Sequence, residues 1–493
     1  MSRSRGRGFR ILIDDRKELM KEDKMEDKKL TFIMYPWYAM GHLTSFLHLS
    51  NKLAHRGHKI FVVHPTNTLS KLEKFNRYPE LINFKSVTVP HVDGLPLGAE
   101  TTSDVPIFNQ NLLCQALDIT LPKIESLIQE IKPHFIFYDF AYWVPSIARK
   151  YKVKSVHYCS IAPSSVGYLM RGENSSSEAE MMEPPPGFPV DSSIKLHKHE
   201  ARLIVALHSM GKNSSSSGSG SGSGSGSCSG SVSFTQRLLL AFQDGDAIAF
   251  KTTREIEGPY CEFVEHKFKK PVVLAGPVLP EPIETSNTEE KWSKWLEKFL
   301  EKTVILCAFG SECNLKKDQF QELVLGLELT GYPFFAALKP PIEAETIEEA
   351  LPEGFKERTQ GKGIVHSGWA EQQLMLSHPS VGCFVTHCGG NSLSEAMINE
   401  CQLVLVPNFG DQFINSRLFG GDLKVGVEVE RNEENGSFTK DGVSKAIKMV
   451  MNDESEEGRK IRANRAKWRE FLLSKGLEDS YIDALIRKLQ CLL

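Results

Sequence analysis

The sequence lacks three features that would each point to a class of protein. No run of apolar residues approaches the roughly 18 that span a bilayer as a helix, so no membrane span is predicted. The 59 lysines and arginines are balanced by 62 aspartates and glutamates, which gives no reason to expect nucleic acid as a partner. The ten cysteines form no CxxC pair, which argues against a zinc site or a redox motif. Reduced thiols in the cytoplasm fit them best.

The composition is otherwise that of an ordinary globular protein, with 41% hydrophobic and 25% charged residues. A chain of 493 residues is too long for one compact core, so two or three domains are expected. Residues 1–27 are polar, highly charged and aperiodic, which predicts a disordered leader and leaves Met25 as an alternative start. They lack the uninterrupted apolar segment of a signal peptide.

Short apolar strands alternate with amphipathic helices in both halves of the chain. In the first half, "LTFIMY" leads through a loop to a helical pattern that ends at Gly57, and "KIFVVH" follows as a second strand. The second half repeats the alternation with the strands "TVILCAF", "PFFAAL", "VGCFVTH" and "LVLVP". Strand, crossover helix and parallel strand make a βαβ unit. We therefore predict an α/β protein with two doubly wound, Rossmann-like domains.

Two segments have the composition of linkers. The proline-rich stretch 276–292 ends in an acidic, polar run and predicts a linker between an N-terminal domain at 28–275 and a C-terminal domain at 293–493. Residues 213–233 consist almost entirely of serine and glycine and have no apolar face to bury. They predict a flexible insertion, either natural or engineered. The last helices of the chain are expected to pack back on the N-terminal domain.

The stretch "THCGGNSLSEA" (386–396) has the features of a phosphate site. A strand that ends in a glycine-rich turn and opens a helix presents free backbone N–H groups and the positive end of a helix dipole. His387 adds an imidazole donor, and Asn391 and Ser392 suit either capping or phosphate contacts. Glu395, one helical turn on, is placed to accept hydrogen bonds from ribose hydroxyls. A tight turn without a ligand is the alternative.

The surroundings of this stretch resemble a known motif. From "GWAEQQ" to "NFGDQ", residues Trp369 to Gln412 are similar, without a gap, to the signature box of plant family-one UDP-dependent glycosyltransferases. "PWYAMGHLTSF", "HVDGLPLGAETTSD" and "FYDFAYWVP" look most like the subgroup that adds a second sugar to flavonoid and anthocyanin glycosides. The resemblance covers nearly all of the chain from about Lys28 onward. It implies two facing Rossmann-like domains of the GT-B type.

The resemblance also implies a donor site on the C-terminal domain. The residues that it assigns to the nucleoside and its ribose are Trp369, Ala370, Gln372 and Glu395. Those that it assigns to the diphosphate are Ser311, His387, Asn391 and Ser392. Those that it assigns to hydroxyls of the transferred sugar are Asp411 and Gln412. Gly390 stands where the family usually has a tryptophan near the donor sugar, so the resemblance does not predict which sugar is transferred.

His42 and Asp139 are the candidates for catalysis. Each follows a predicted strand, on the side of a doubly wound sheet where ligands bind. A histidine accepts a hydroxyl proton near neutral pH, and a carboxylate on its second nitrogen fixes the tautomer and stabilises the imidazolium. From the residues alone, a helix cap and a helix start remain the alternative. The catalytic dyad of the family falls on these two residues, which favours catalysis.

Two further motifs are interpreted as structural. "DGD" (244–246) matches a metal-binding pattern of a different glycosyltransferase fold, but no further ligands are near it and a turn is predicted. "HKHE" (197–200) is predicted to be a solvated surface segment. No metal and no cofactor are expected, because the UDP-sugar is a co-substrate.

The sequence thus predicts a cytoplasmic, monomeric, inverting UDP-glycosyltransferase. Its partners would be a UDP-sugar donor and a small-molecule acceptor, a sugar hydroxyl of a flavonoid or anthocyanin 3-O-glycoside. Transfer to an aglycone hydroxyl of a flavonoid or terpenoid is the alternative activity. The alternative without activity is an inactive UDP-sugar-binding protein.

Overall fold

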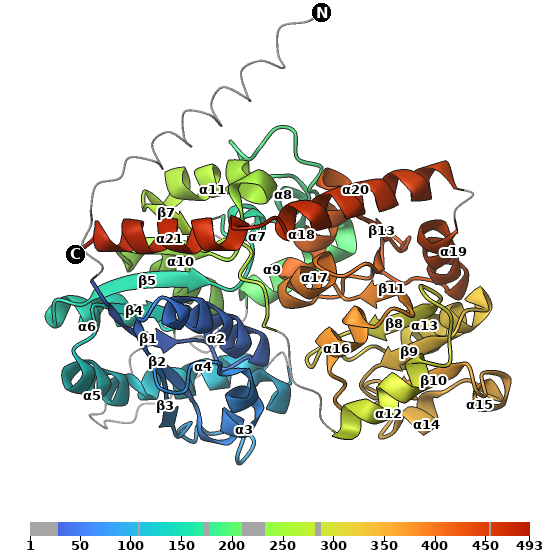
Figure 1. Cartoon of the computed structure of the whole chain (residues 1–493), viewed down its shortest axis with the longest axis horizontal. Helices are drawn as coiled ribbons and strands as arrows, with labels where there is room; N and C mark the ends of the chain where they lie inside the picture. The colour runs from blue at the N-terminus through green and yellow to red at the C-terminus, as the bar shows by residue number, and fades with distance from the viewer. Residues whose placement is uncertain (1–27, 107–108, 172–176, 210–231, 282–286, 453–454) are drawn as a thin grey trace, which may run out of the picture.

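The computed structural model describes residues 28–106, 109–171, 177–209, 232–281, 287–452 and 455–493. The predicted leader 1–27 and residues 213–231 of the Ser/Gly segment lie outside these ranges. The chain forms two lobes, each built on one sheet, with blue to green segments in the first lobe and yellow to red segments in the second (Figure 1).

The first lobe contains a parallel sheet with the strand order β3-β2-β1-β4-β5-β6-β7. Along the chain these strands are β1 (Thr31–Tyr35), β2 (Lys59–Pro65), β3 (Ile82–Val87), β4 (Phe135–Tyr138), β5 (Lys154–Cys159), β6 (Ala247–Phe250) and β7 (Val272–Leu274). The helices of this lobe are α2 (Met40–His55), α3 (Leu69–Leu72), α4 (Gln110–Ile119), α5 (Leu121–Ile131), α6 (Val144–Lys150), α7 (Pro163–Leu169), α8 (Glu178–Met182), α9 (Lys198–Ser209), α10 (Phe234–Asp244) and α11 (Arg254–Phe268).

The second lobe contains a parallel sheet with the order β10-β9-β8-β11-β12-β13. Its strands are β8 (Val304–Ala308), β9 (Phe334–Ala337), β10 (Gly363–His366), β11 (Val381–Thr386), β12 (Gln402–Leu405) and β13 (Gly426–Glu428). Its helices are α12 (Asn287–Leu296), α13 (Lys317–Thr330), α14 (Ile347–Ala350), α15 (Phe355–Arg358), α16 (Gln372–Ser377), α17 (Gly390–Met397), α18 (Asp411–Arg417), α19 (Lys440–Met451) and α20 (Glu456–Leu472). The predicted fold class, two Rossmann-like α/β units, is confirmed.

The central strands are continuous apolar runs because helices cover both faces of each sheet. In β1, Phe32, Ile33 and Met34 are fully buried, although alternate residues point to opposite faces. Helix α2 follows β1 and ends as predicted, since Gly57 has φ +81° and its N–H donates to the carbonyl of Ala54.

The chain returns to the first lobe at its end. Helix α21 (Leu477–Gln490) buries Ile482, Leu485 and Leu489 in the same apolar cluster as β1 and α2. Arg56, directly after α2, also donates to Asp479 at 2.9 Å. In Figure 1 the red helix α21 lies along the first lobe, and α20 extends over the second lobe.

The predicted linker at 276–292 is too long at its C-terminal end. Helix α12 begins at Asn287, and Trp292 packs against Phe335 of the second sheet with ring centroids 4.8 Å apart. The burial of Trp292 gives this segment an apolar contact that a solvated linker would lack. In the part of the chain that is described, no helix is both long and apolar enough to cross a membrane.

Candidate active site

One cleft between the two lobes brings together all the predicted site residues. It has a volume of about 810 Å³, which is within the range of small-molecule sites. The predicted residues that line it are His42, Asp139, Ser311, Trp369, Ala370, Gln372, His387, Gly390, Asn391, Ser392, Glu395, Asp411 and Gln412. The strand order reverses between β1 and β4 and between β8 and β11, and the cleft lies at the carboxyl ends of these four strands. Doubly wound proteins bind their ligands at such points.

His42 and Asp139 form a hydrogen-bonded pair. His42 Nδ1 lies 2.6 Å from Asp139 Oδ2, and Asp139 itself is almost completely buried. The other carboxylate oxygen, Oδ1, accepts hydrogen bonds of 2.6 Å from the backbone N–H groups of Trp37 and Phe140. These two bonds fix the orientation of the carboxylate. His42 therefore keeps its proton on Nδ1 and has Nε2 free to accept another.

The electrostatic surroundings favour protonation of His42. Burial lowers the pKa of His42, but the charge and hydrogen bond of Asp139, together with Glu312 and Asp411, raise it above the ordinary value of 6.5. Burial also raises the pKa of Asp411 to about 6. A proton taken from an acceptor hydroxyl would thus be held on an imidazole that three carboxylates surround.

His387 is packed between two glycine-containing turns. A Cβ atom at Gly389 would lie 2.5 Å from His387 Nε2, and one at Gly310 would lie 3.1 Å from it. The glycines of "FGS" and "HCGG" therefore leave room for the ring. Burial lowers the pKa of His387 to about 4, so the imidazole is neutral at physiological pH and can donate a hydrogen bond without carrying a charge. Ser311 lines the cleft in the turn that follows Gly310.

Helix α17 begins at Gly390, the second glycine of the glycine-rich turn. Its first residues line the cleft, and the unpaired N–H groups at the start of a helix are suited to an anion. Asn391 Nδ2 donates to the carbonyl of Gly41 at 2.7 Å, so this helix touches the first lobe. A Cβ atom at Gly390 would meet only the carbonyl of Ser160, at 3.9 Å. The missing tryptophan thus leaves open space beside the helix N-terminus.

Glu395 is held by two glutamine side chains. Gln372 Nε2 donates to Oε2 of Glu395 at 2.6 Å, and Gln373 Nε2 donates to Oε1 at 3.2 Å. Gln372 also donates to Ser392 Oγ at 3.2 Å. Burial raises the pKa of Glu395, and the two amides oppose that shift. Both carboxylate oxygens are therefore fixed in place beside the helix start.

Trp369 forms an exposed wall of the cleft, with 61% of its surface accessible. Its Nε1 donates to Glu371 at 2.9 Å, and Lys74 of the first lobe lies over the ring, 5.5 Å from its centroid. Lys74 also pairs with Glu371. Ala370 is partly buried next to this wall. An accessible indole face held by two polar contacts is suited to stacking on a flat base.

Asp411 and Gln412 open helix α18 at the side of the cleft nearest His42. Gln412 Oε1 accepts hydrogen bonds of 3.1 Å from the backbone N–H groups of Asn408 and Phe409, which leaves its amide N–H groups free to donate. Asp411 accepts from Asn415 at 3.1 Å. Gly410 precedes the helix with φ +57°, a conformation that favours glycine.

Two charged residues near the cleft were not predicted from the sequence. Lys251, directly after β6, donates from Nζ to Asn391 Oδ1 at 3.3 Å. Burial lowers the pKa of Lys251 to about 8, while Glu395 opposes the shift. Glu312 lines the cleft beside Ser311 and accepts a hydrogen bond from Thr102. Lys251 directly follows β6 and Glu312 lies in the loop after β8, and these positions are the signal that could have found them.

The remaining wall of the cleft, in the first lobe, is apolar and aromatic. Trp37 and Phe140 stack with centroids 4.8 Å apart beside the histidine. The apolar residues that continue this wall are Leu169, Met170, Ile204, Leu207, Phe234, Leu238 and Phe242. Such a surface is suited to a flat, largely apolar molecule whose polar groups reach His42.

The structure agrees with the interpretation of "DGD" (244–246) as a turn and disagrees with that of "HKHE" (197–200) as a solvated surface segment. Asp246 of "DGD" accepts hydrogen bonds from the backbone N–H and hydroxyl of Ser155, so it ties a turn to β5. The prediction of a solvated surface for "HKHE" is wrong, because Glu200 is fully buried against residues of the second lobe. Across the ranges that the structure describes, no group of three or more His, Cys, Asp or Glu residues is arranged to hold a metal ion.

Comparisons with known proteins agree on one family. Residues 304–463 match the family model described as UDP-glucoronosyl and UDP-glucosyl transferase. The chain is 54% identical over 465 residues to a cyanidin 3-O-galactoside 2''-O-xylosyltransferase from Actinidia chinensis var. chinensis, covering 93% of this chain and 98% of that protein. It is 52% identical to an anthocyanidin 3-O-glucoside 2''-O-glucosyltransferase from Ipomoea nil, covering 93% and 97%.

Solved structures share the fold at lower identity. The structure of UGT73P12 from Glycyrrhiza uralensis, complexed with glycyrrhetinic acid 3-O-monoglucuronide, superposes with a TM-score of 0.75 at 22% identity. It covers 94% of this chain and 96% of that one. A UDP-glucose: anthocyanidin 3-O-glucosyltransferase in complex with UDP gives a TM-score of 0.73 at 24% identity, covering 94% and 100%.

Proposed function

Because this chain belongs to the UDP-glucoronosyl and UDP-glucosyl transferase family, we propose that it adds a second sugar to a flavonoid or anthocyanin 3-O-glycoside. The observation that carries the proposal is the cleft itself. The His42–Asp139 pair and an aromatic wall stand on one side, and the N-termini of α17 and α18 stand on the other. Two relatives are named as enzymes that transfer xylose or glucose to the 2''-hydroxyl of such glycosides, and this supports the choice of acceptor.

The proposed binding of the UDP-sugar is supported by the chemical match between its parts and the residues of the cleft. The uracil would stack on Trp369, and its ribose hydroxyls would donate to Glu395, which two glutamines hold in position. The diphosphate would accept hydrogen bonds from His387 and from the first N–H groups of α17. Asp411 and Gln412 would bind hydroxyls of the transferred sugar. Gly390 leaves space beside that sugar.

The chemistry is a single displacement at the anomeric carbon. His42 Nε2 would remove the proton from the acceptor hydroxyl, and Asp139 would stabilise the resulting imidazolium. The hydroxyl oxygen forms a bond to the anomeric carbon while the bond to the diphosphate oxygen breaks, and UDP leaves with the electron pair. With the acceptor hydroxyl at His42 and the diphosphate at the start of α17, the attack would be in line and the anomeric configuration would invert. The negative charge that develops on UDP lies beside the helix N-terminus and Lys251.

The proposal is tested by supplying UDP-xylose, UDP-glucose and UDP-galactose with cyanidin 3-O-glucoside, cyanidin 3-O-galactoside or cyanidin itself. We expect UDP release and a product heavier by one sugar with the glycosides, and a 1→2 linkage by NMR. The His42→Ala variant is the matched control. Transfer to cyanidin alone would favour the aglycone alternative. UDP binding without any turnover would mean an inactive UDP-sugar-binding protein.

The predictions of a monomer, of a cytoplasmic location and of a reaction without metal or cofactor stay predictions. In the described ranges the cysteines are all unpaired thiols. Size-exclusion chromatography with light scattering tests the monomer, and a fluorescent fusion tests the location.

A further inference from the structure

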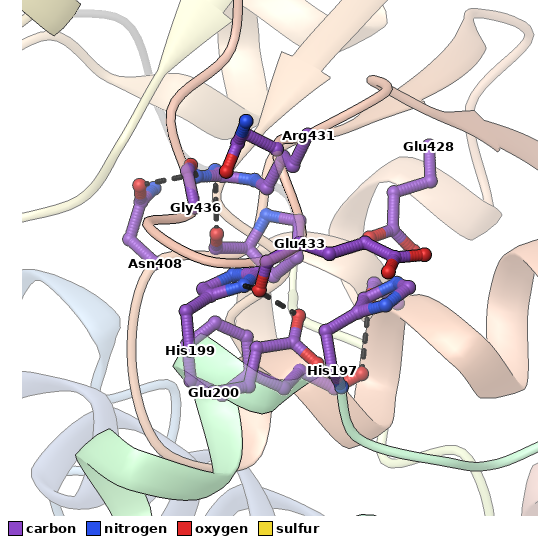
Figure 2. Close-up of polar contacts among 12 residues, drawn as sticks. His197, His199, Glu200, Asn408, Glu428, Arg431, Glu433 and Gly436 are labelled. Atoms are coloured by element: carbon purple, nitrogen blue, oxygen red, sulfur yellow. Dashed lines mark hydrogen bonds and ion pairs between the residues drawn. The ribbon is translucent and has the colours of Figure 1, made fainter.

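The segment "HKHE" forms part of a buried polar cluster where the two lobes meet. Figure 2 shows His199 and Glu200, on the green start of helix α9, facing the orange segments that carry Glu433 and Gly436. His199 Nδ1 lies 3.2 Å from the carbonyl of Glu433. Gly436, with φ +74°, packs against the His199 ring, where a Cβ atom would clash. The first turn of α9 is therefore fitted to the second lobe.

Arg417 joins the two lobes through Glu200. Its Nη2 donates to both carboxylate oxygens of Glu200, at 2.8 and 2.9 Å, and its Nη1 pairs with Glu428 at the end of β13. Glu200 has no accessible surface and also accepts the N–H of His197 at 2.8 Å. An ion pair of this kind, buried and with its oxygens satisfied, holds one geometry in a way that an exposed pair does not.

Arg431 extends the cluster toward the loop that leads into helix α18. It donates to the carbonyl of Gly436 at 2.7 Å and to the carbonyl of Pro407 at 2.6 Å, and it also contacts Asn408 Oδ1 at 3.3 Å. Asn408 in turn donates its N–H to Gln412. Glu200, Arg417, Glu428 and Arg431 thus place two negative and two positive charges together, directly behind the loop that opens α18.

The two helices that this cluster joins carry opposite parts of the reaction. One turn after Glu200, helix α9 presents Ile204 and Leu207 to the acceptor wall of the cleft. Arg417 ends helix α18, whose first residues, Asp411 and Gln412, face the position proposed for the transferred sugar. The ion pair is therefore a direct connection between the acceptor wall and the sugar-binding helix.

We propose that Glu200 is a positioning residue for sugar transfer, which fixes the distance between the bound acceptor and the transferred sugar by holding α18 against α9. The inference rests on the proposed function. An error of about 1 Å between reacting groups lowers a rate by about 100-fold, so a loose connection would show in the transfer step. Hydrolysis of the UDP-sugar by water needs no acceptor wall and would be spared.

The test compares transfer with hydrolysis in Glu200→Gln, which keeps the shape of the side chain and removes its charge. We expect kcat for transfer to a glycoside to fall about 10- to 100-fold. UDP release without acceptor and the Kd of UDP should stay within about twofold, so the ratio of transfer to hydrolysis falls. The matched control is Lys198→Met on the same helix. Lys198 pairs with Glu434 across the lobes at 2.9 Å but is exposed, and we expect its loss to leave the ratio unchanged.

Each outcome decides between the alternatives. An unchanged ratio in folded Glu200→Gln overturns the inference, whereas wild-type protein that transfers no sugar at all overturns the proposed function instead. If Glu200→Gln does not fold, Glu200→Asp carries the test. Its shorter carboxylate reaches Arg417 only if α9 and α18 shift, so its ratio should also fall, and a wild-type ratio would again overturn the inference. The double variant Glu200→Gln, Gln412→Ala should lower the transfer rate by less than the product of the two single reductions, because both residues act through α18. A reduction equal to that product would mean that the two residues act independently.

Discussion

Lys251 Nζ, at the end of β6 in the first lobe, donates to Asn391 Oδ1 of helix α17 in the second lobe at 3.3 Å. Asn391 is in the first turn of α17, which is proposed to hold the diphosphate, and His387 in the preceding loop is neutral because burial lowers its pKa to about 4. Lys251 thus brings a cationic side chain to this turn from the opposite lobe. If UDP leaves from this position, Lys251 would lie beside the negative charge that develops on it.

Replacing Lys251 tests this relationship. We expect Lys251→Met to lower kcat about 100-fold, the size of effect that follows the loss of one group that stabilises developing charge. Lys251→Arg keeps the cation and should retain more activity. Lys85→Met is the control, because Lys85 is a half-buried lysine of β3 that pairs with Glu130 and does not line the cleft. Steady-state kinetics with a saturating acceptor measure the effect, and a rate for Lys251→Met equal to that of the control would remove Lys251 from the reaction.

The pH dependence of kcat/KM should have two limbs. His42 acts as a base only when deprotonated, and its pKa is raised by Asp139 and the nearby carboxylates, so activity is lost as the pH falls through that value. Protonation of Asp411, whose pKa is raised to about 6 by burial, adds to the loss on the acid side. On the alkaline side, Lys251 loses its charge near pH 8.

The Lys251→Arg variant separates the two limbs. Arginine stays protonated throughout this range, so the decline near pH 8 should move beyond pH 9 while the acid limb stays in place. An alkaline limb unchanged in this variant would show that another group causes it.

Asp139→Asn should damage catalysis almost as much as loss of His42. Asp139 Oδ1 accepts two backbone N–H bonds, so an asparagine would place its carbonyl there and turn its NH₂ group toward His42 Nδ1. That arrangement favours the tautomer with the proton on Nε2, which cannot accept the acceptor proton. We expect kcat to fall about 10²- to 10⁴-fold in Asp139→Asn and His42→Ala. Calorimetry should find UDP affinity nearly unchanged in both, and near-normal turnover in His42→Ala would contradict the mechanism.

Two substitutions distinguish the residue proposed to bind the ribose of UDP from the residue proposed to bind the transferred sugar. Glu395→Ala removes the acceptor for the ribose hydroxyls, and hydrogen bonds to a charged group contribute about 1.5–3 kcal/mol each, so UDP and every UDP-sugar should bind at least tenfold more weakly. Gln412→Ala should leave UDP affinity intact and change the ranking among UDP-sugars. Calorimetry with UDP, UDP-glucose and UDP-xylose measures both. Unchanged UDP binding by Glu395→Ala would refute the assignment of Glu395.

Removal of metal ions should leave transfer unaffected. Lys251 and the N-terminus of α17 provide the positive potential at the proposed diphosphate position. We expect the initial rate after dialysis against EDTA to stay within about twofold of the rate with added Mg²⁺ or Mn²⁺. A rate that depends on either ion would contradict this prediction and would indicate that carboxylates near the diphosphate bind a metal ion.

The sequence by itself determined the strand and helix alternation and the turn that is proposed to hold the diphosphate. Residues His387 to Glu395 are consecutive in one strand, turn and helix, so their grouping depends only on local structure. His42 and Asp139 are 97 positions apart, yet their pairing could also be predicted. Each follows a strand, and parallel strands end at the same edge of a sheet.

Only the tertiary structure decided which polar residues are buried between the lobes. "HKHE" has the composition of a solvated segment, and Glu200 is nevertheless fully buried because Arg417, 217 positions later, pairs with it. Lys251 likewise reaches Asn391 across 140 positions. The free energy of burying a charge depends on its partner. Which residue becomes that partner depends on how the two lobes pack together, and it cannot be predicted from the residues that neighbour the charge in the sequence.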